Sequence, residues 1–133
     1  MTQQVKALVK QISASASRGT VRNHSTICDR PEAKGGSNQG PMGGELLLVG
    51  LGGCFMSNLL AAIEARKADV SNLSIEIDAT LEDAPPRFSQ IVMSISGDYQ
   101  DKAMMQKLVT VAERGCIAAN TIKPAVDLRF KIL

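Results

Sequence analysis

The chain has 133 residues, the length of one domain, and 44% of them are hydrophobic, which is enough for a core. Aromatic residues make up only 3%, and the net charge of +2 comes from interspersed signs, so base stacking and a basic patch for nucleic acid are both excluded. The segment Met1–Arg18 has no continuous apolar stretch, which predicts a cytoplasmic protein without a secretory signal. In that reducing compartment the three cysteines are expected to be thiols, and an odd number leaves at least one unpaired.

The N-terminal part of the chain predicts three short strands. Residues 5–17 show no helical stripe and are predicted as a strand, Arg18-Gly19 as a turn, and residues 20–23 and 24–28 as two further strands. A glycine-rich loop follows at residues 34–44, in which five of the eleven residues are Gly. It lacks the GxxxxGK[ST] spacing of a phosphate-binding loop, so nucleotide binding is not expected.

A long apolar helix is predicted over Glu45–Lys67, and residues 46–63 carry no charge. Eighteen helical residues span about 27 Å, roughly the width of a small domain, so we expect the helix to be buried on nearly all sides. A membrane-spanning role is disfavoured because Ser57 and Asn58 are polar at its centre. Three glycines directly precede Cys54, which indicates that another helix or a ligand approaches the backbone there.

The C-terminal half predicts two strands, a helix and a last strand. Residues 73–81 alternate strictly, 82–87 turn the chain, and 88–96 return as a second strand. Apolar residues then recur at helical spacing over 101–119, and residues 126–133 alternate again. The order β-β-β-α-β-β-α-β predicts a single α+β domain over residues 1–133, with antiparallel sheets and two buried helices.

Two cysteines each follow a glycine on the apolar side of a predicted helix, as Gly53-Cys54 and Gly115-Cys116. Helices that cross at such small residues could bring the two Cα atoms within the roughly 7 Å that a disulfide requires. The pattern leaves two alternatives open. Cys54 and Cys116 are either a redox pair or two inert core cysteines, which is the more common situation.

Two segments resemble a known family. The pattern D-x-P…GG-x-x-x-GP…ELLL-x-x-L-GGC covers Asp29–Cys54, and RGCIAANT covers Arg114–Thr121. With the order of strands and helices, they resemble the OsmC/Ohr family of osmotically inducible and organic hydroperoxide resistance proteins. The resemblance implies an OsmC-like, intertwined homodimer with two active sites at the subunit interface, and a cysteine-based peroxidase without a metal or organic cofactor.

The resemblance also implies roles for single residues. Cys54 would be the thiolate that attacks the hydroperoxide and becomes a sulfenic acid, and Cys116 would resolve it as a disulfide. A small dithiol or lipoyl group would then reduce that disulfide by exchange. An arginine from the end of the first strand would stabilise the Cys54 thiolate. Arg18 is the best match for that arginine and Arg22 the second, and the sequence does not choose between them.

One departure from the family pattern concerns a carboxylate. The peroxidase branches carry a Pro-Glu pair before the central helix, whose Glu orients the arginine, and here those positions are Gly43 and Gly44. Glu45 follows one residue later, and a helical step of about 100° aims it elsewhere. It either substitutes for the missing Glu or caps the helix N-terminus. The departure supports an alternative function, a non-catalytic OsmC-like protein that binds a small apolar ligand in a glycine-lined cavity near Cys54.

His24 and Cys28 could complete a Cys3His zinc set with the other two cysteines. Residues four apart on a strand lie about 13 Å from each other, too far for one tetrahedral ion, so no metal is expected. We therefore expect His24 at a strand end in the dimer interface and Cys28 as a buried strand cysteine.

Overall fold

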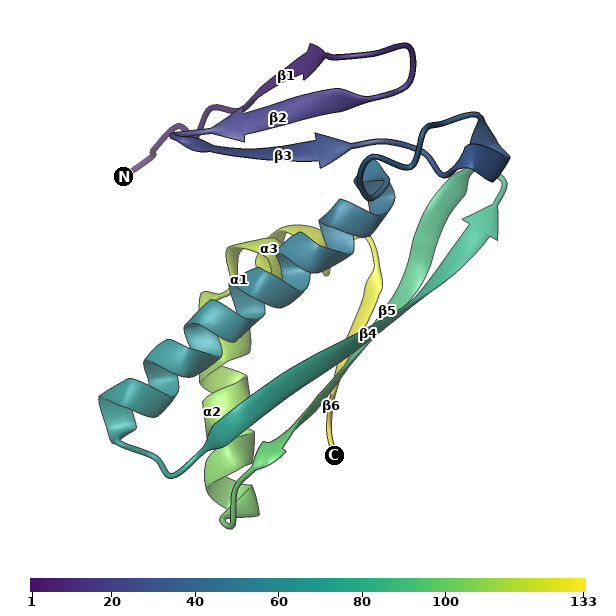
Figure 1. Cartoon of the computed structure of the whole chain (residues 1–133). Helices are drawn as coiled ribbons and strands as arrows, with labels where there is room; N and C mark the ends of the chain where they lie inside the picture. Colours follow the sequence, from purple (N-terminus) through teal and green to yellow (C-terminus); the bar gives the residue numbers. More distant parts are fainter. The chain divides into compact units, whose positions relative to one another are not determined.

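The computed structural model describes residues 1–133, which form two compact units, Met1–Leu48 and Val49–Leu133 (Figure 1). The elements in chain order are β1 (Leu8–Gln11), β2 (Ser17–Val21), β3 (His24–Cys28), the 3-10 helix η1 (Glu32–Lys34), α1 (Gly43–Arg66), β4 (Ser71–Asp83), β5 (Pro86–Asp98), α2 (Lys102–Gly115), α3 (Ile117–Ile122) and β6 (Asp127–Ile132). The predicted α+β class and order of elements are confirmed, with η1 and α3 in addition. That residues 1–133 act as a single domain stays a prediction.

The first unit holds an antiparallel sheet in the order β1-β2-β3. The turn between β1 and β2 is built by Ser13, whose hydroxyl oxygen accepts the backbone N–H groups of Ser15 (3.2 Å) and Ala16 (2.9 Å). The predicted turn at Arg18-Gly19 is wrong, since both residues pair within β2. The hydroxyl of Ser13 thus closes the turn that the sequence pattern places at Gly19, six residues later.

A buried carboxylate organises the segment between β3 and α1. Asp29 is only 2% exposed, and its side chain accepts N–H groups from Arg30 (2.7 Å), Ser37 (3.2 Å) and Gln39 (3.1 Å). Burial alone would raise the pKa of Asp29, but these hydrogen bonds outweigh it and hold the pKa below its usual value. The carboxylate therefore acts as the centre of the loop.

Two glycines of this loop allow it to fold back on the preceding strand. A Cβ at Gly36 would collide with the carbonyl oxygen of Arg30, and one at Gly40 with that of Ile27. Gly35 adopts a φ of 87°, in the left-handed region. The glycine-rich stretch is thus a packed loop in which close backbone contacts require Gly36 and Gly40, and a left-handed φ favours glycine at Gly35.

The second unit is built on a mixed sheet in the order β4-β5-β6. β4 and β5 form a long antiparallel hairpin, while β6 pairs parallel to β5. The expectation of purely antiparallel sheets is wrong at this edge. The chain crosses over through α2 and α3 before β6 and so re-enters the sheet in the direction of β5, as parallel neighbours require.

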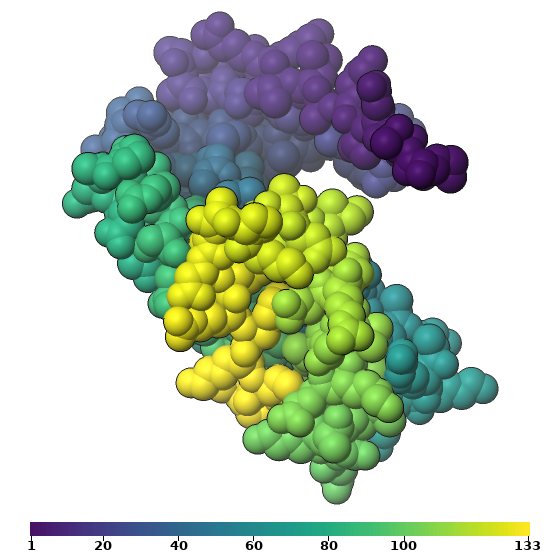
Figure 2. Space-filling view, turned by 180° about the vertical axis from the view of Figure 1, so that it is seen from behind, coloured from purple at the N-terminus to yellow at the C-terminus, as the bar shows by residue number.

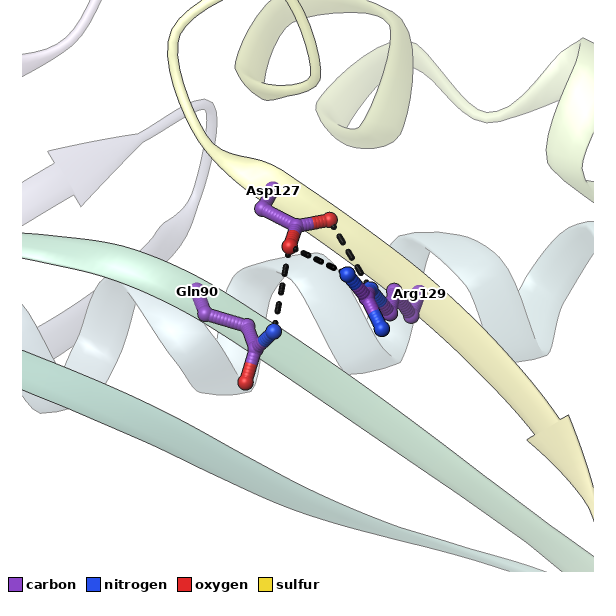
Figure 3. A network of polar contacts seen from close by, with 3 residues as sticks. All are labelled: Gln90, Asp127 and Arg129. Atoms are coloured by element: carbon purple, nitrogen blue, oxygen red, sulfur yellow. Dashed lines mark hydrogen bonds and ion pairs between the residues drawn. The ribbon is translucent and has the colours of Figure 1, made fainter.

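A polar network lies where β6 enters the sheet (Figure 3). Asp127, the first residue of β6, is paired in register with Gln90 and accepts its Nε2–H at 3.0 Å. Arg129 forms the only ion pair of the chain with the same carboxylate, at 2.9 Å. These hydrogen bonds hold the pKa of Asp127 below its usual value, and the hydrogen bond from Arg129 has the largest effect. The network fixes the start of the parallel pairing.

Helices cover one face of this sheet (Figure 1). The alternate residues on the opposite face are mostly polar. The alternate positions that face the helices share apolar side chains: Ile75, Ile77, Ala79, Ile91, Met93, Ile95, Leu128, Phe130 and Ile132. On the helix side, Phe55 of α1 stacks on Phe130 with ring centroids 4.8 Å apart and an angle of 34° between the rings. This layer is the core of the second unit.

Only one face of α1 is buried within the chain. Its fully covered apolar side chains, Leu51, Phe55, Leu59 and Ala62, recur at helical spacing. Leu47, Val49 and Leu60 are 50%, 64% and 52% exposed. Burial on nearly all sides is therefore wrong for the single chain. By length and composition α1 could cross a membrane, a test that core helices also pass.

The predicted helix over 101–119 is two helices. α2 begins after Asp101, whose carboxylate accepts the N–H of Met104 at 3.0 Å, and it ends at Gly115. Cys116 is extended, with φ −81° and ψ 109°, and α3 follows. Asn120 and Thr121, which follow the predicted helix, lie inside α3. Seen from behind, α2, α3 and β6, coloured green to yellow, make up the face of the second unit that is turned to the viewer (Figure 2).

Candidate functional site

The second unit brings Cys54 and Cys116 together. Cys54 lies in the middle of α1 and is half-buried, whereas Cys116, between α2 and α3, is 0% exposed. Both are free thiols. The pKa of Cys116 is raised, first by burial and then by the neighbouring thiol of Cys54. Cys116 therefore keeps its proton near neutral pH, and the two thiols are neighbours.

The sulfur of Cys116 has a second role in the fold. As the N-cap of α3, it accepts the backbone N–H of Ala119 at 3.4 Å. The backbone N–H of Cys116 donates to the carbonyl oxygen of Glu113 at 3.2 Å, so both sides of the residue are anchored. The buried thiol thus has a defined position against α1, while the half-buried thiol of Cys54 can be reached from outside.

The three glycines before Cys54 have different surroundings. A Cβ at Gly52 would lie 2.7 Å from Cδ1 of Ile77, so β4 approaches the helix backbone at this point. Nothing lies within 4 Å of the corresponding positions at Gly50 and Gly53. The chain's own sheet accounts for one of the three glycines and leaves the other two facing open space.

The remaining predicted site residues lie in the first unit. Arg18 is exposed within β2, opposite Lys10 and Ile27. Arg22 is exposed in the turn between β2 and β3, with a φ of 55°. Glu45 accepts the backbone N–H of Met42, just before α1, at 2.8 Å. No ion pair joins Glu45 to either arginine, and the carboxylate caps the first turn of α1.

His24 and Cys28 occupy the two ends of β3. His24 is exposed at the start of the strand, and Cys28 is half-buried at its end. A Cβ at Gly43 would lie 3.7 Å from the sulfur of Cys28, so this thiol faces the first turn of α1. No group of three or more His, Cys, Asp or Glu side chains is placed to hold a metal ion.

One side chain of this site, that of Asn58, is not singled out by residue patterns alone. Asn58 lies one turn after Cys54, and its Nδ2–H donates to the carbonyl oxygen of Cys54 at 2.9 Å. The signal was present, because Asn58 is the only amide side chain in the uncharged run of residues 46–63. From the sequence, its polarity argues only against a membrane-spanning helix.

Comparison with protein families shows which family the chain belongs to. The sequence model of the OsmC-like proteins matches residues 36–131. The chain belongs to the OsmC-like protein family. The match extends from the glycine-rich loop to β6 and includes both Cys54 and Cys116. A comparison with curated proteins found no significant match.

Solved structures share the OsmC-like fold over the whole chain. An OsmC like protein from Mycoplasma pneumoniae superposes with a TM-score of 0.86 at 13% identity, covering 100% of this chain and 98% of that one. An organic hydroperoxide resistance protein OsmC from Legionella pneumophila gives 0.72 at 17% identity, with 99% and 98% covered. The organic hydroperoxide resistance protein OhrB of Bacillus subtilis gives 0.69 at 15%, with 98% of each chain covered. At these identities the likeness shows the fold.

Proposed function

We propose that this OsmC-like protein is a thiol-dependent peroxidase that reduces organic hydroperoxides through Cys54 and Cys116. The observation that carries the proposal is that a half-buried thiol, Cys54, neighbours a fully buried, protonated one, Cys116. Two proteins of the same fold are named for organic hydroperoxide resistance, which agrees with this chemistry. A general role in redox or stress defence is supported by the family itself.

The first step takes place at Cys54, because its sulfur is the accessible one. The thiolate attacks the outer oxygen of the hydroperoxide, the O–O bond breaks, and the alkoxide leaves as an alcohol after taking up a proton. Cys54 is oxidised to a sulfenic acid. In the second step the sulfur of Cys116 attacks that sulfenic sulfur, water leaves, and a Cys54–Cys116 disulfide forms. The pair has then lost two electrons to one molecule of peroxide.

The cycle closes when an external dithiol, such as a lipoyl group, reduces the disulfide. Since Cys116 is 0% exposed, the reductant attacks the sulfur of Cys54 and the thiolate of Cys116 leaves. The second thiol of the reductant then breaks the mixed disulfide and becomes oxidised itself. Both cysteines return to thiols, and no metal or organic cofactor takes part.

Arg18 is our first candidate for the cation that activates Cys54, and Arg22 the second. Both side chains are exposed and take part in no ion pair, so either guanidinium is free to interact with a thiolate. The backbone of Arg18 is held within β2 between two paired strands, whereas Arg22 lies in a turn with a φ of 55°. That difference favours Arg18.

A homodimer is part of the proposal. The outer face of α1 exposes Val49 and Leu60 by more than half, and the positions over Gly50 and Gly53 on the same side are open. Apolar surface next to glycines suits close packing against another helix. The family resemblance implies that this partner is a second copy of the chain. Such a homodimer would place two Cys54 sites near one interface.

A second candidate function rests on Glu45. This carboxylate is used as a helix cap, and glycines occupy the positions of the family's Pro-Glu pair. A chain without the carboxylate that aims the arginine would suit a binding protein for a small apolar molecule. Retention of both cysteines as neighbours favours the peroxidase.

Stopped-flow kinetics tests the proposed function. The reduced protein is mixed with cumene hydroperoxide, a fatty-acid hydroperoxide or hydrogen peroxide, and peroxide consumption is followed for wild type, Cys54→Ser and Cys28→Ser. We expect the organic peroxides to react faster than hydrogen peroxide, Cys54→Ser to abolish the reaction, and Cys28→Ser to react as wild type does. Equal slow consumption by wild type and Cys54→Ser would establish the binding protein instead.

A further inference from the structure

The junction between α2 and α3 leaves Cys116 little freedom to find Cys54 by itself. Its sulfur and its backbone N–H are engaged with Ala119 and Glu113, and the side chain of Asn120 donates to the carbonyl oxygen of Arg114 at 3.0 Å. The thiol is 0% exposed and cannot swing through solvent. Its distance from Cys54 is therefore set by how closely the end of α2 packs on α1.

Asn58 lies at that packing point. Its Nδ2–H is bound to the carbonyl oxygen of Cys54, which turns Oδ1 towards Gly115. A Cβ on Gly115 would lie 2.8 Å from Oδ1 and 3.6 Å from Cγ of Asn58. The residue that precedes Cys116 thus rests on the residue one turn after Cys54, and only glycine fits this approach without displacing the amide.

Local propensity does not explain these two residues. Asn is a weaker helix former than Ala, and Gly is weaker still, yet Asn58 lies in the middle of α1 and Gly115 in the last turn of α2. Gly115 has a negative φ, so no left-handed conformation requires a glycine there. Their shared feature is the contact that holds the two cysteine-bearing segments together.

We propose that Asn58 is a positioning residue for the resolving step, with Gly115 as its counterpart, so that together they hold the sulfur of Cys116 at attacking distance from Cys54. The proposal rests on the proposed function. It concerns only the step in which Cys116–SH and Cys54–SOH form a disulfide and release water. The earlier attack on peroxide uses Cys54 and is independent of this contact.

The variants Asn58→Ala and Gly115→Ala separate the two steps in the full-length protein. After one equivalent of cumene hydroperoxide, we measure the oxidation of Cys54, the formation of the disulfide, and the capture of sulfenic acid by dimedone. Both variants are expected to oxidise at the wild-type rate. Disulfide formation should slow by about tenfold or more, because a misplacement of about 1 Å can cost a factor of about 100, and the dimedone adduct on Cys54 should accumulate.

Two controls decide the outcome. Ser57→Ala, the exposed neighbour on the same helix, should behave as wild type, and thermal unfolding should show that all variants are folded at the assay temperature. Diamide oxidises thiol pairs without peroxide, so the rate of its reaction depends on how the two thiols are placed and not on the peroxide step. It should form the disulfide more slowly in both variants. Wild-type rates of disulfide formation in the two variants would overturn the positioning role. Failure of the wild type with peroxide but not with diamide would instead overturn the proposed function.

Discussion

The carboxylate nearest to the start of α1 is already engaged. Glu45 accepts the N–H of Met42 at 2.8 Å, and neither Arg18 nor Arg22 takes part in an ion pair. Gly44 occupies the position where the family resemblance places a glutamate that orients the arginine. A guanidinium without that partner is less precisely aimed, so the proposed peroxide reduction should be measurable but slow.

Restoring the carboxylate tests this account at the level of one residue. Gly44→Glu should speed peroxide reduction, because orienting a catalytic group can recover a large part of a lost rate. Gly44→Gln, of the same size but uncharged, is the matched control and should not. Arg18→Ala should slow the reaction, and Arg22→Ala should do so instead if the arginine is assigned wrongly. Equal rates in all four variants would remove the arginine from the mechanism.

Cys54 and Cys116 could be singled out from the sequence because each follows a glycine inside a motif of eight residues or more. The break of the helix at Cys116 could not be predicted from the sequence. Residues 117–122 continue the helical spacing of α2, and the interruption depends on the cysteine sulfur as the cap of α3. The contact of Asn58 with Gly115 joins residues 57 positions apart, a distance that no local pattern spans.

At the scale of elements, the loop between β3 and α1 depends on one ionised side chain. Asp29 binds three backbone N–H groups, and its pKa lies below the usual value of about 3.9. A depressed pKa in the folded state contributes stability that is present above the unfolded pKa and is lost as the pH falls through the folded one. The loop should therefore be insensitive to pH near neutrality and weaken only in acid.

Asp29→Asn should lower the melting temperature at neutral pH, because the amide loses the charge that strengthens the hydrogen bonds to the loop. It should also reduce the loss of stability below a pH of about 4. Thermal unfolding of wild type, Asp29→Asn and the exposed control Asp69→Asn over this pH range measures both effects. An acid profile of Asp29→Asn that matches wild type would show that this carboxylate does not hold the loop.

The elements differ in how far their sequences predict them. Alternation identifies β4, β5 and β6 because one face of that sheet packs on helices and the other faces solvent. The parallel direction of β6 follows from the crossover of α2 and α3, which is a tertiary property. α1 is apolar on all sides, so its sequence does not distinguish the face against the sheet from the face that stays exposed.

For the whole molecule, the exposed apolar side chains on the outer face of α1 indicate that a partner covers them, and we propose that this partner is a second copy of the chain. Light scattering should give twice the chain mass of 14.1 kDa at micromolar concentration, with an interface well above the roughly 1,600 Å² of a standard complex. Leu60→Glu should shift the protein towards the monomer, because Leu60 is 52% exposed within the chain and would be covered in the dimer. Leu81→Glu, at a residue that is 58% exposed on β4, is the matched control. A monomeric wild type would contradict the proposal.

Cys54 and Cys116 are proposed to act as one redox pair, and mapping of the disulfide is the direct test of this pairing. The reduced protein is treated with one equivalent of cumene hydroperoxide, alkylated, digested and analysed by mass spectrometry, with Cys28→Ser as a parallel sample. The account predicts one disulfide per chain, between Cys54 and Cys116 of the same chain, with Cys28 alkylated as a free thiol. A bridge that contains Cys28, or three free thiols after peroxide treatment, would contradict it.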